Sequence, residues 1–179
     1  MPIYDAVTLR HFSAAGVLEL LGKRAKSQDP PFWTEEVAEE IARASQYEQH
    51  CLHILRAKWL SVPEPPQLAD IPSIYRLQVG LNLGVDPPEK HRGEAESIYF
   101  AEKLQLSFVT DDNGAHDFAI RRHLLGPGKV LDTVDILRQC VADYQITAHQ
   151  ASDIATTIEN QGRSFRRNHR GMLESSDYF

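Results

Sequence analysis

The spacing of apolar residues predicts helices that alternate with short strands. In the segment after Asp5, apolar residues recur with helical spacing at Leu9, Phe12, Val17, Leu20 and Leu21. Gly16 is expected to break this segment into two short helices. A further helix is predicted to begin TEEVAEEIARA, with Thr34 as its N-cap and two glutamates in its first turn. We expect its apolar side to continue for about six turns, through Val37, Ile41, Tyr47, Cys51, Leu52 and Leu55.

The rest of the chain keeps this alternation. Short apolar runs predict strands at residues 59–62, 106–109 and 129–133, while residues 2–5 are too short to assign from their pattern alone. Helices are predicted over 73–83, 94–104, 115–125, 134–144 and 148–161. The Pro-rich stretch of residues 63–88 is expected to be a surface excursion, because the apolar pattern resumes at Gly93. We therefore expect one α/β domain over residues 1–179 with a parallel sheet.

Composition narrows the class of protein. The chain has 179 residues, of which 42% are hydrophobic and 25% charged, which suits one globular domain with a substantial core. Its net charge of −6 argues against tight non-specific binding of nucleic acid. Two cysteines give no disulfide framework, so a reducing cytoplasm is expected. No apolar run approaches the roughly 18–20 residues of a membrane span, so no membrane association is expected.

The candidate functional residues are concentrated between Gly93 and Asp112, in the sequence GEAESIYFAEKLQLSFVTDD. Glu94 opens a predicted helix, where the helix dipole tolerates negative charge. Asp111 and Asp112 follow a predicted strand, at the end where open parallel sheets keep their ligand sites. Separated acids that face one site are what a hard divalent cation requires.

This stretch resembles the second half of a PIN domain, a fold shared by Mg²⁺- or Mn²⁺-dependent nucleases. It is similar to the branch that carries a GEAEAI-like helix followed by a TDD turn, and that branch is similar to the VapC-type toxin ribonucleases. The resemblance covers roughly residues 3–140 and implies a three-layer α/β/α sandwich around a central parallel sheet of four or five strands. Residues 141–179 would form a helical C-terminal extension.

The resemblance assigns further acids outside this stretch. Members open with an Asp, a Ser or Thr soon after it, and a Gly eleven residues past it, which Asp5, Thr8 and Gly16 match. The second acid is the Glu of a V-x-x-E-I pattern, which fits Glu40, and Glu39 is its rival.

The implied catalytic acids are therefore Asp5, Glu40, Glu94 and Asp112, and the same four, together with Asp111 as a rival to Asp112, are the expected ligands of Mg²⁺ or Mn²⁺. Supporting roles fall to Thr8, Thr110 and Asn113, because their polar groups could hold the attacking water or the phosphate. Any one of these acids is more often a surface residue than a ligand, since the chain has 25 Asp and Glu residues. The assignment rests on the order of the four acids along the chain and on the family motif around each of them.

Two features near the end of the chain stand outside this pattern. The family usually has a small residue where this chain has Asp132, which is either a fifth acid near the metal or, as we favour, a cap for the next helix. Basic residues of the C-terminal segment are candidates for RNA backbone contact, with a solvated helix end as the equal alternative: Arg163, Arg166, Arg167 and Arg170.

The sequence thus predicts a divalent-metal-dependent endoribonuclease, with the toxin of a toxin–antitoxin pair as one form of it. The expected partners are an RNA substrate, and the resemblance adds an antitoxin protein and a second copy of the chain as candidates. The alternative is a PIN-like module that binds nucleic acid or protein with little or no catalysis. The presence of all four acids favours the enzyme.

Overall fold

Three short parallel strands form the centre of the protein in the computed structural model, which describes residues 1–24, 31–82, 87, 90–122, 124–126 and 128–166. The strands are β1 (Pro2–Tyr4), β2 (Ser107–Val109) and β3 (Val130–Leu131), in the order β1-β2-β3. Phe108 pairs with Ile3 on one side and Val130 on the other. An isolated parallel bridge from Ile3 to Phe32 extends the β1 edge.

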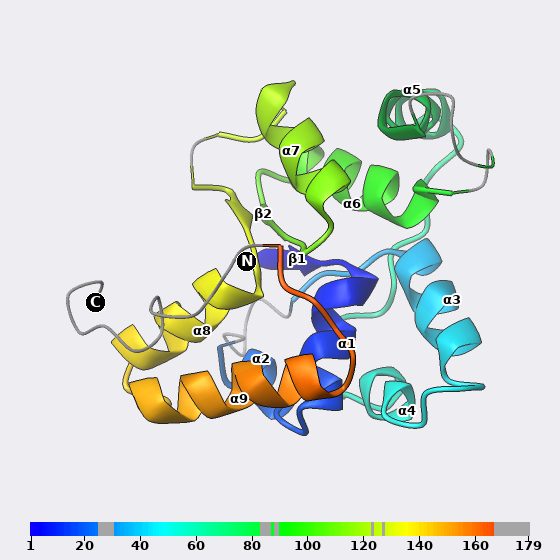
Figure 1. Ribbon diagram of the computed structural model, residues 1–179. Coiled ribbons are helices and arrows are strands. Elements are labelled where there is room, and N and C mark those ends of the chain that lie inside the picture. The colour runs from blue at the N-terminus through cyan, green and yellow to red at the C-terminus, as the bar shows by residue number, and fades with distance from the viewer. Residues whose placement is uncertain (25–30, 83–86, 88–89, 123, 127, 167–179) are drawn as a thin grey trace.

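Helices lie on both faces of this sheet (Figure 1). One face is covered by α1 (Ala6–Ala14), α2 (Glu19–Arg24), α3 (Glu35–Ala44), α4 (Cys51–Leu55), α8 (Thr133–Ala142) and α9 (Ala148–Asn160). The other face is covered by α6 (Arg92–Lys103) and α7 (Asn113–Arg121), with α5 (Ile71–Asn82) packed on α6. The chain is therefore an α/β protein with a parallel sheet, as the sequence predicted.

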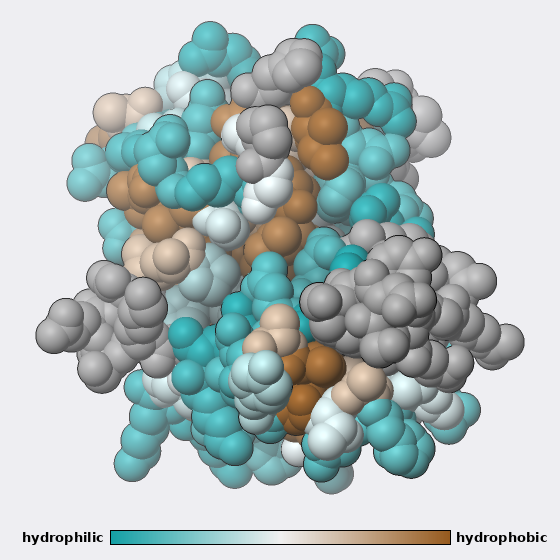
Figure 2. Space-filling view, turned by 90° about the vertical axis from the view of Figure 1, so that its left-hand side faces the viewer, coloured by the Kyte–Doolittle hydropathy of each residue, from teal (hydrophilic) through white to brown (hydrophobic). Residues whose placement is uncertain are grey.

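Alternation along the strands divides the core into two clusters. Tyr4 and Val109 point into the cluster beneath the sheet, while Ile3 and Phe108 point into the cluster under α6 and α7. All four residues are fully buried, as expected for strands with helices on both sides. Figure 2 shows apolar residues at the surface of the upper half of the molecule, the half that α5, α6 and α7 form. These elements carry the partly buried Leu77, Leu81 and Phe118 that cover the second cluster.

The prediction of four or five strands is wrong for the described residues, which contain three. Residues 59–62 form no strand; Leu60 is buried in the core, whereas Val62 is 86% exposed. The chain here runs beside residues 31–35 through backbone bonds from Ser61 N to Pro31 O, from Glu64 N to Trp33 O and from Glu35 N to Glu64 O. Prolines at 63, 65 and 66 have no N–H to donate, so a longer ladder cannot form.

The predicted six-turn helix after Thr34 is also wrong. The helix α3 ends at Ala44, and after a turn the short helix α4 begins at Cys51. Tyr47 follows Ile41 by six positions, about one and two-thirds turns, so it would leave the apolar face, and it is 88% exposed. The hydroxyl of Ser45 donates to the carbonyl of Ala42, a local bond that competes with continued helix.

The helix predicted over 115–125 corresponds to α7, which begins at Asn113 and already ends at Arg121, before the glycines at 126 and 128. Other predicted breaks and helices agree with the structure. Gly16 separates α1 from α2 with a φ of 71°, a left-handed conformation that suits glycine. Thr34 caps α3 by accepting a hydrogen bond from Val37 N. Helices α5, α8 and α9 each begin within two residues of their predicted starts. Cys51 and Cys140 are free thiols, and both are buried.

No helix in the described part of the chain is at once long and apolar enough to cross a bilayer.

We predict that Phe108→Ala lowers the free energy of unfolding by about 3–5 kcal/mol, because it opens a cavity in the fully buried middle strand. Ile120→Ala is the matched control, since Ile120 is 47% exposed on α7, and it should cost less than about 0.5 kcal/mol. Urea unfolding measures both values. Equal losses in the two variants would contradict the assignment of β2 to the centre of the core.

Candidate functional site

The site begins where β1 and β2 end. Asp5 directly follows β1, is 3% exposed, and caps α1 by accepting a 2.8 Å hydrogen bond from Thr8 N. Thr110 directly follows β2, and its hydroxyl donates to the carboxylate of Asp5. The same hydroxyl oxygen accepts a 3.0 Å bond from Asp112 N. Thr110 therefore links two of the predicted catalytic acids across the carboxyl edge of the sheet.

These contacts give the predicted supporting residues different roles. Thr8 donates its hydroxyl to the carbonyl of Val109 at 3.2 Å, which fixes α1 to the end of β2. The hydroxyl proton of Thr110 is directed at Asp5, so Thr110 positions acids rather than a water or a phosphate. Asn113 is the exposed first residue of α7.

Glu40 and Glu94 meet where α3 crosses the start of α6. A methyl group added at Gly93 would lie only 3.5 Å from Oε2 of Glu40, so the Glu40 carboxylate rests on the backbone next to Glu94. Oε2 of Glu94 is buried and has no hydrogen-bond partner within the described residues. The Glu40 carboxylate is therefore in van der Waals range of position 93, the residue before Glu94.

Burial and mutual repulsion raise the pKa values of these acids. Burial raises the pKa of Glu40 to about 7, and the charge of Glu94 adds to this effect. Burial also raises the pKa of Glu94, with the charge of Asp112 acting in the same direction. For Asp5, burial raises the pKa to about 8 against the opposing hydrogen bonds from Thr110 and Thr8. Glu40 and Glu94 therefore lie close enough for the charge of Glu94 to raise the pKa of Glu40, whereas the acid that raises the pKa of Asp5 is Asp111.

We call Asp5, Glu40, Glu94 and Asp112 the acid cluster. They come from the ends of β1 and β2 and from α3 and α6, so the fold brings four distant segments to one region. In the described part of the chain, no three ligand atoms of the acid cluster lie within 4.8 Å of one another; the group that meets this criterion is formed by other residues, described below.

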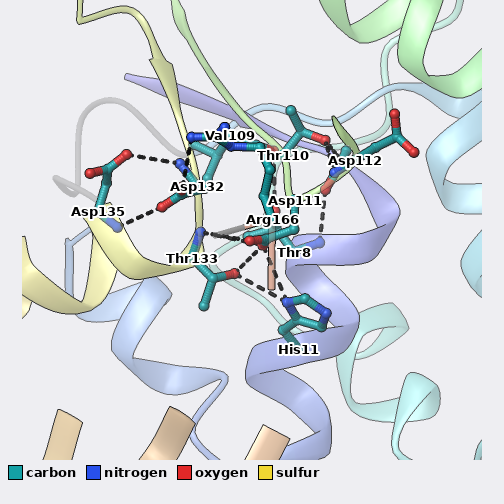
Figure 3. Close-up of polar contacts among 11 residues, drawn as sticks. Thr8, His11, Val109, Thr110, Asp111, Asp112, Asp132, Thr133, Asp135 and Arg166 are labelled. Carbon is teal, nitrogen blue, oxygen red and sulfur yellow. Dashed lines mark hydrogen bonds and ion pairs between the residues drawn. The ribbon is translucent and has the colours of Figure 1, made fainter. Parts of the chain in front are cut away.

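The rival acids lie elsewhere. Glu39 points to solvent on α3, where its carboxylate lies 3.5 Å from Arg43. Asp111 is buried on the opposite side of the turn from Asp112 (Figure 3). Its Oδ2 accepts from the hydroxyl of Thr133 and lies 3.2 Å from Nδ1 of His11. Its lone pairs are thus engaged in joining β2, α8 and α1.

Asp112 and Asp132 both cap helices. Oδ1 of Asp112 accepts a 2.7 Å bond from Ala115 N at the start of α7, which leaves Oδ2 for other partners. Asp132 forms a capping box with Asp135 at the start of α8, so the cap interpretation of Asp132 is confirmed (Figure 3). Arg166 approaches Asp132 to 3.4 Å.

The C-terminal segment 163–166 runs from the end of α9 back along α1 toward the sheet (Figure 1). Arg163 pairs with Glu48, which also holds Arg10 of α1, and burial lowers the pKa of Arg163. Phe165 packs on the ring of His11 with 5.6 Å between centroids. Arg163 and Arg166 are therefore committed to acidic partners, and Arg167 and Arg170 lie outside the described residues.

A second group of metal-ligand types lies at the start of α4. Ligand atoms of Glu48, His50 and Cys51 lie within 4.8 Å of one another. Both oxygens of Glu48 already bind arginines, however, and Oε2 also lies 3.1 Å from the His50 ring. Two guanidinium groups beside the same carboxylate make this group a poor place for a dication.

Sequence reasoning missed the residues that hold the site in place. His11 and Thr133 are separated by 122 positions, yet Nδ1 of His11 lies 3.3 Å from the Thr133 hydroxyl and both side chains contact Asp111, so nothing in the sequence indicates their contact. A row of charges on α3 and α6 was equally unforeseen, although Arg92 and Glu96 stand at a spacing that favours helical ion pairs.

Comparison with known proteins gave no match: no protein-family model, no curated protein and no solved structure matches this chain.

We predict that Glu40→Gln stabilises the metal-free protein at pH 8 and has little effect at pH 4.5. The folded state holds the Glu40 proton up to about pH 7, whereas the unfolded state releases it near the usual 4.5, so stability falls as pH rises through this window. Glutamine removes this loss, and the melting temperature in EDTA should exceed that of the parent by a few degrees at pH 8.

Glu39→Gln is the matched control, because it changes the same charge one position away on the exposed side of α3. Its melting temperature should follow the pH profile of the parent. A Glu39→Gln profile that matches Glu40→Gln would show that the effect comes from net charge rather than from the acid cluster.

Proposed function

We propose that this chain is a divalent-metal-dependent endoribonuclease with a PIN-like α/β/α sandwich. The observation that carries the proposal is the gathering of Asp5, Glu40, Glu94 and Asp112, from four separate segments, at the carboxyl edge of a parallel sheet. Helices on both faces of the sheet support the three-layer arrangement. The sheet of three described strands is smaller than the resemblance implies.

The acid cluster suits a hard cation. Its donors are carboxylate oxygens, the class of ligand that Mg²⁺ and Mn²⁺ prefer. Glu94 Oε2 is buried and lacks a partner in the described structure, which is costly for an acid unless something else binds it. Glu40, Glu94 and Asp112 would hold the ion, with Asp5 beside them. When bound, the ion supplies charge neutralisation at the phosphate and a lower pKa for an attacking water.

The residues of the chain would then orient the reaction. A water oxygen attacks phosphorus in line with the bond to the 3′ oxygen, that bond breaks, and the products are a 5′-phosphate and a 3′-hydroxyl. Glu94 is our candidate for accepting the proton of the water, because one of its oxygens is not engaged by any described donor. Thr110 maintains the geometry by holding Asp5 and the backbone of Asp112 together.

The presence of all four expected acids favours a catalytic function over that of a binding module. Burial raises the pKa values of Asp5, Glu40 and Glu94, so keeping these acids charged destabilises the fold and a purely structural module gains nothing from them. RNA is the proposed substrate, and an antitoxin or a second copy of the chain remains a proposed partner.

We predict that Asp112→Asn lowers Mn²⁺-dependent RNA cleavage by about 100-fold or more, because the variant loses a charge that holds the ion. The fold should survive, since asparagine is also a good N-cap for α7. Its melting temperature in EDTA should equal or exceed that of the parent, and added Mn²⁺ should raise it less than it raises the parent value. Gel assays of single-stranded RNA and thermal melts measure these effects.

Asp153→Asn is the control, because its side chain is 67% exposed on α9 and it removes the same charge. It should cleave as the parent does. Equal cleavage by Asp112→Asn and the parent at saturating Mn²⁺ would exclude Asp112 as a ligand, and an inactive parent would exclude the nuclease.

A further inference from the structure

A pocket of about 660 Å³ lies between α3, α5 and α6. Its α5 wall carries Ile71 and Tyr75, whose exposed fractions are 45% and 62%. Its opposite wall is charged and is formed by α3 and α6. A pocket with one flat aromatic wall and one polar wall suits a planar ligand that carries hydrogen-bonding groups at its edge.

The charged wall is a row of side chains linked by ion pairs. Glu36 on α3 is 2.9 Å from Arg43 through one oxygen and 3.2 Å from Arg92 through the other. Arg92 in turn lies 3.1 Å from Oε1 of Glu96 on α6. The side chain of Glu36 is only 12% exposed, so the row is built into the wall rather than spread over the surface.

Glu96 ends this row with a buried carboxylate on which the Arg92 guanidinium and the backbone N–H of Glu36 both act. Its side chain is 1% exposed, and its Oε2 has no hydrogen-bond partner within the described residues. A buried acceptor without a donor is unfavourable, so a ligand that brings an N–H to this oxygen would gain the missing bond. The adjacent Arg92 guanidinium offers donors, half exposed, to an oxygen acceptor on the same ligand.

The pocket is linked to the acid cluster through α3. Glu36 precedes Glu40 by one helical turn, and its charge raises the pKa of Glu40. Glu96 and Glu94 are two positions apart on α6, so their side chains leave that helix in different directions. A ligand in the pocket would therefore lie about one turn of α3 from a phosphodiester held at the acid cluster.

We propose that this pocket binds one unpaired nucleobase, guanine, of the RNA whose phosphodiester lies at the acid cluster. The proposal rests on the ribonuclease function proposed above. Guanine places an N1–H donor beside the O6 acceptor, which matches Glu96 Oε2 beside Arg92. Tyr75 provides the stacking surface. Because a stacked, edge-bound base must leave its helix, the substrate class is single-stranded RNA with a guanine next to the cleaved bond.

Tyr75→Ala tests the stacking surface without risk to the core, because this side chain is largely exposed. We expect the KM for a guanine-containing single-stranded RNA to rise about 10-fold while kcat changes less than about twofold. Tyr47→Ala, at an 88% exposed tyrosine outside the pocket, should leave both constants unchanged. A KM in Tyr75→Ala equal to that of the parent overturns the proposal.

Glu96→Gln tests the choice of base. The parent should cut next to guanine, and replacing that guanine by adenine, which has an acceptor at N1, should reduce cleavage at the site about 10-fold or more. In Glu96→Gln the difference between the two substrates should shrink to less than about threefold. An unchanged preference in this variant, or a parent that cuts without regard to base, overturns the assignment.

A binding assay in which RNA is not cleaved tests the base pocket separately from the nuclease activity. Calorimetry in EDTA should detect guanosine 5′-monophosphate on the parent and equally on Asp112→Asn, with weaker binding of the adenosine, cytidine and uridine monophosphates and loss of binding in Tyr75→Ala. Selective guanosine monophosphate binding by a parent that cannot cut RNA supports the base pocket and overturns the nuclease. RNA cleavage by a parent that binds all four monophosphates alike supports the nuclease and overturns the base pocket.

Discussion

The hydrogen bond from Thr110 to Asp5 is the contact on which the rest of the site depends. Asp5 is buried at the end of β1, and burial opposes its charge. Two donors offset this cost in part, because Thr8 N donates to one oxygen of Asp5 and the Thr110 hydroxyl donates to the other. The same Thr110 hydroxyl oxygen accepts from Asp112 N. One threonine at a strand end thus determines the separation of two acids that belong to segments about a hundred residues apart in the chain.

The parts of the fold that follow from local chemistry could be predicted. Thr34 and Asp132 cap helices as their residue types and positions suggested, and Gly16 breaks the first helical segment through its left-handed conformation. Glu40 and Glu94 were placed by their motifs and do lie beside each other. These features depend on a few neighbouring residues, so a sequence pattern contains most of the information.

The parts that depend on distant contacts could not be predicted. Apolar spacing past Ile41 suggested a continued helix, but the six-residue step to Tyr47 and the Ser45 hydroxyl ended it. The C-terminal arginines looked available for phosphate, yet Arg163 and Arg166 bind Glu48 and Asp132, acids far away in sequence. Pairing of this kind depends on the folded geometry, and charge alone does not indicate which acid an arginine will meet.

The position of segment 163–166 has a consequence for folding during synthesis. Arg163 joins Arg10 on Glu48, Phe165 packs on His11, and Arg166 reaches Asp132, so three contacts of the late chain rest on residues placed around the acid cluster. During synthesis the sheet and α8 can leave the ribosome before any of these contacts exists. All four acids are present once residue 112 has been made, whereas these contacts form only after residue 166 has emerged, so a nascent chain of intermediate length carries the acids without these contacts.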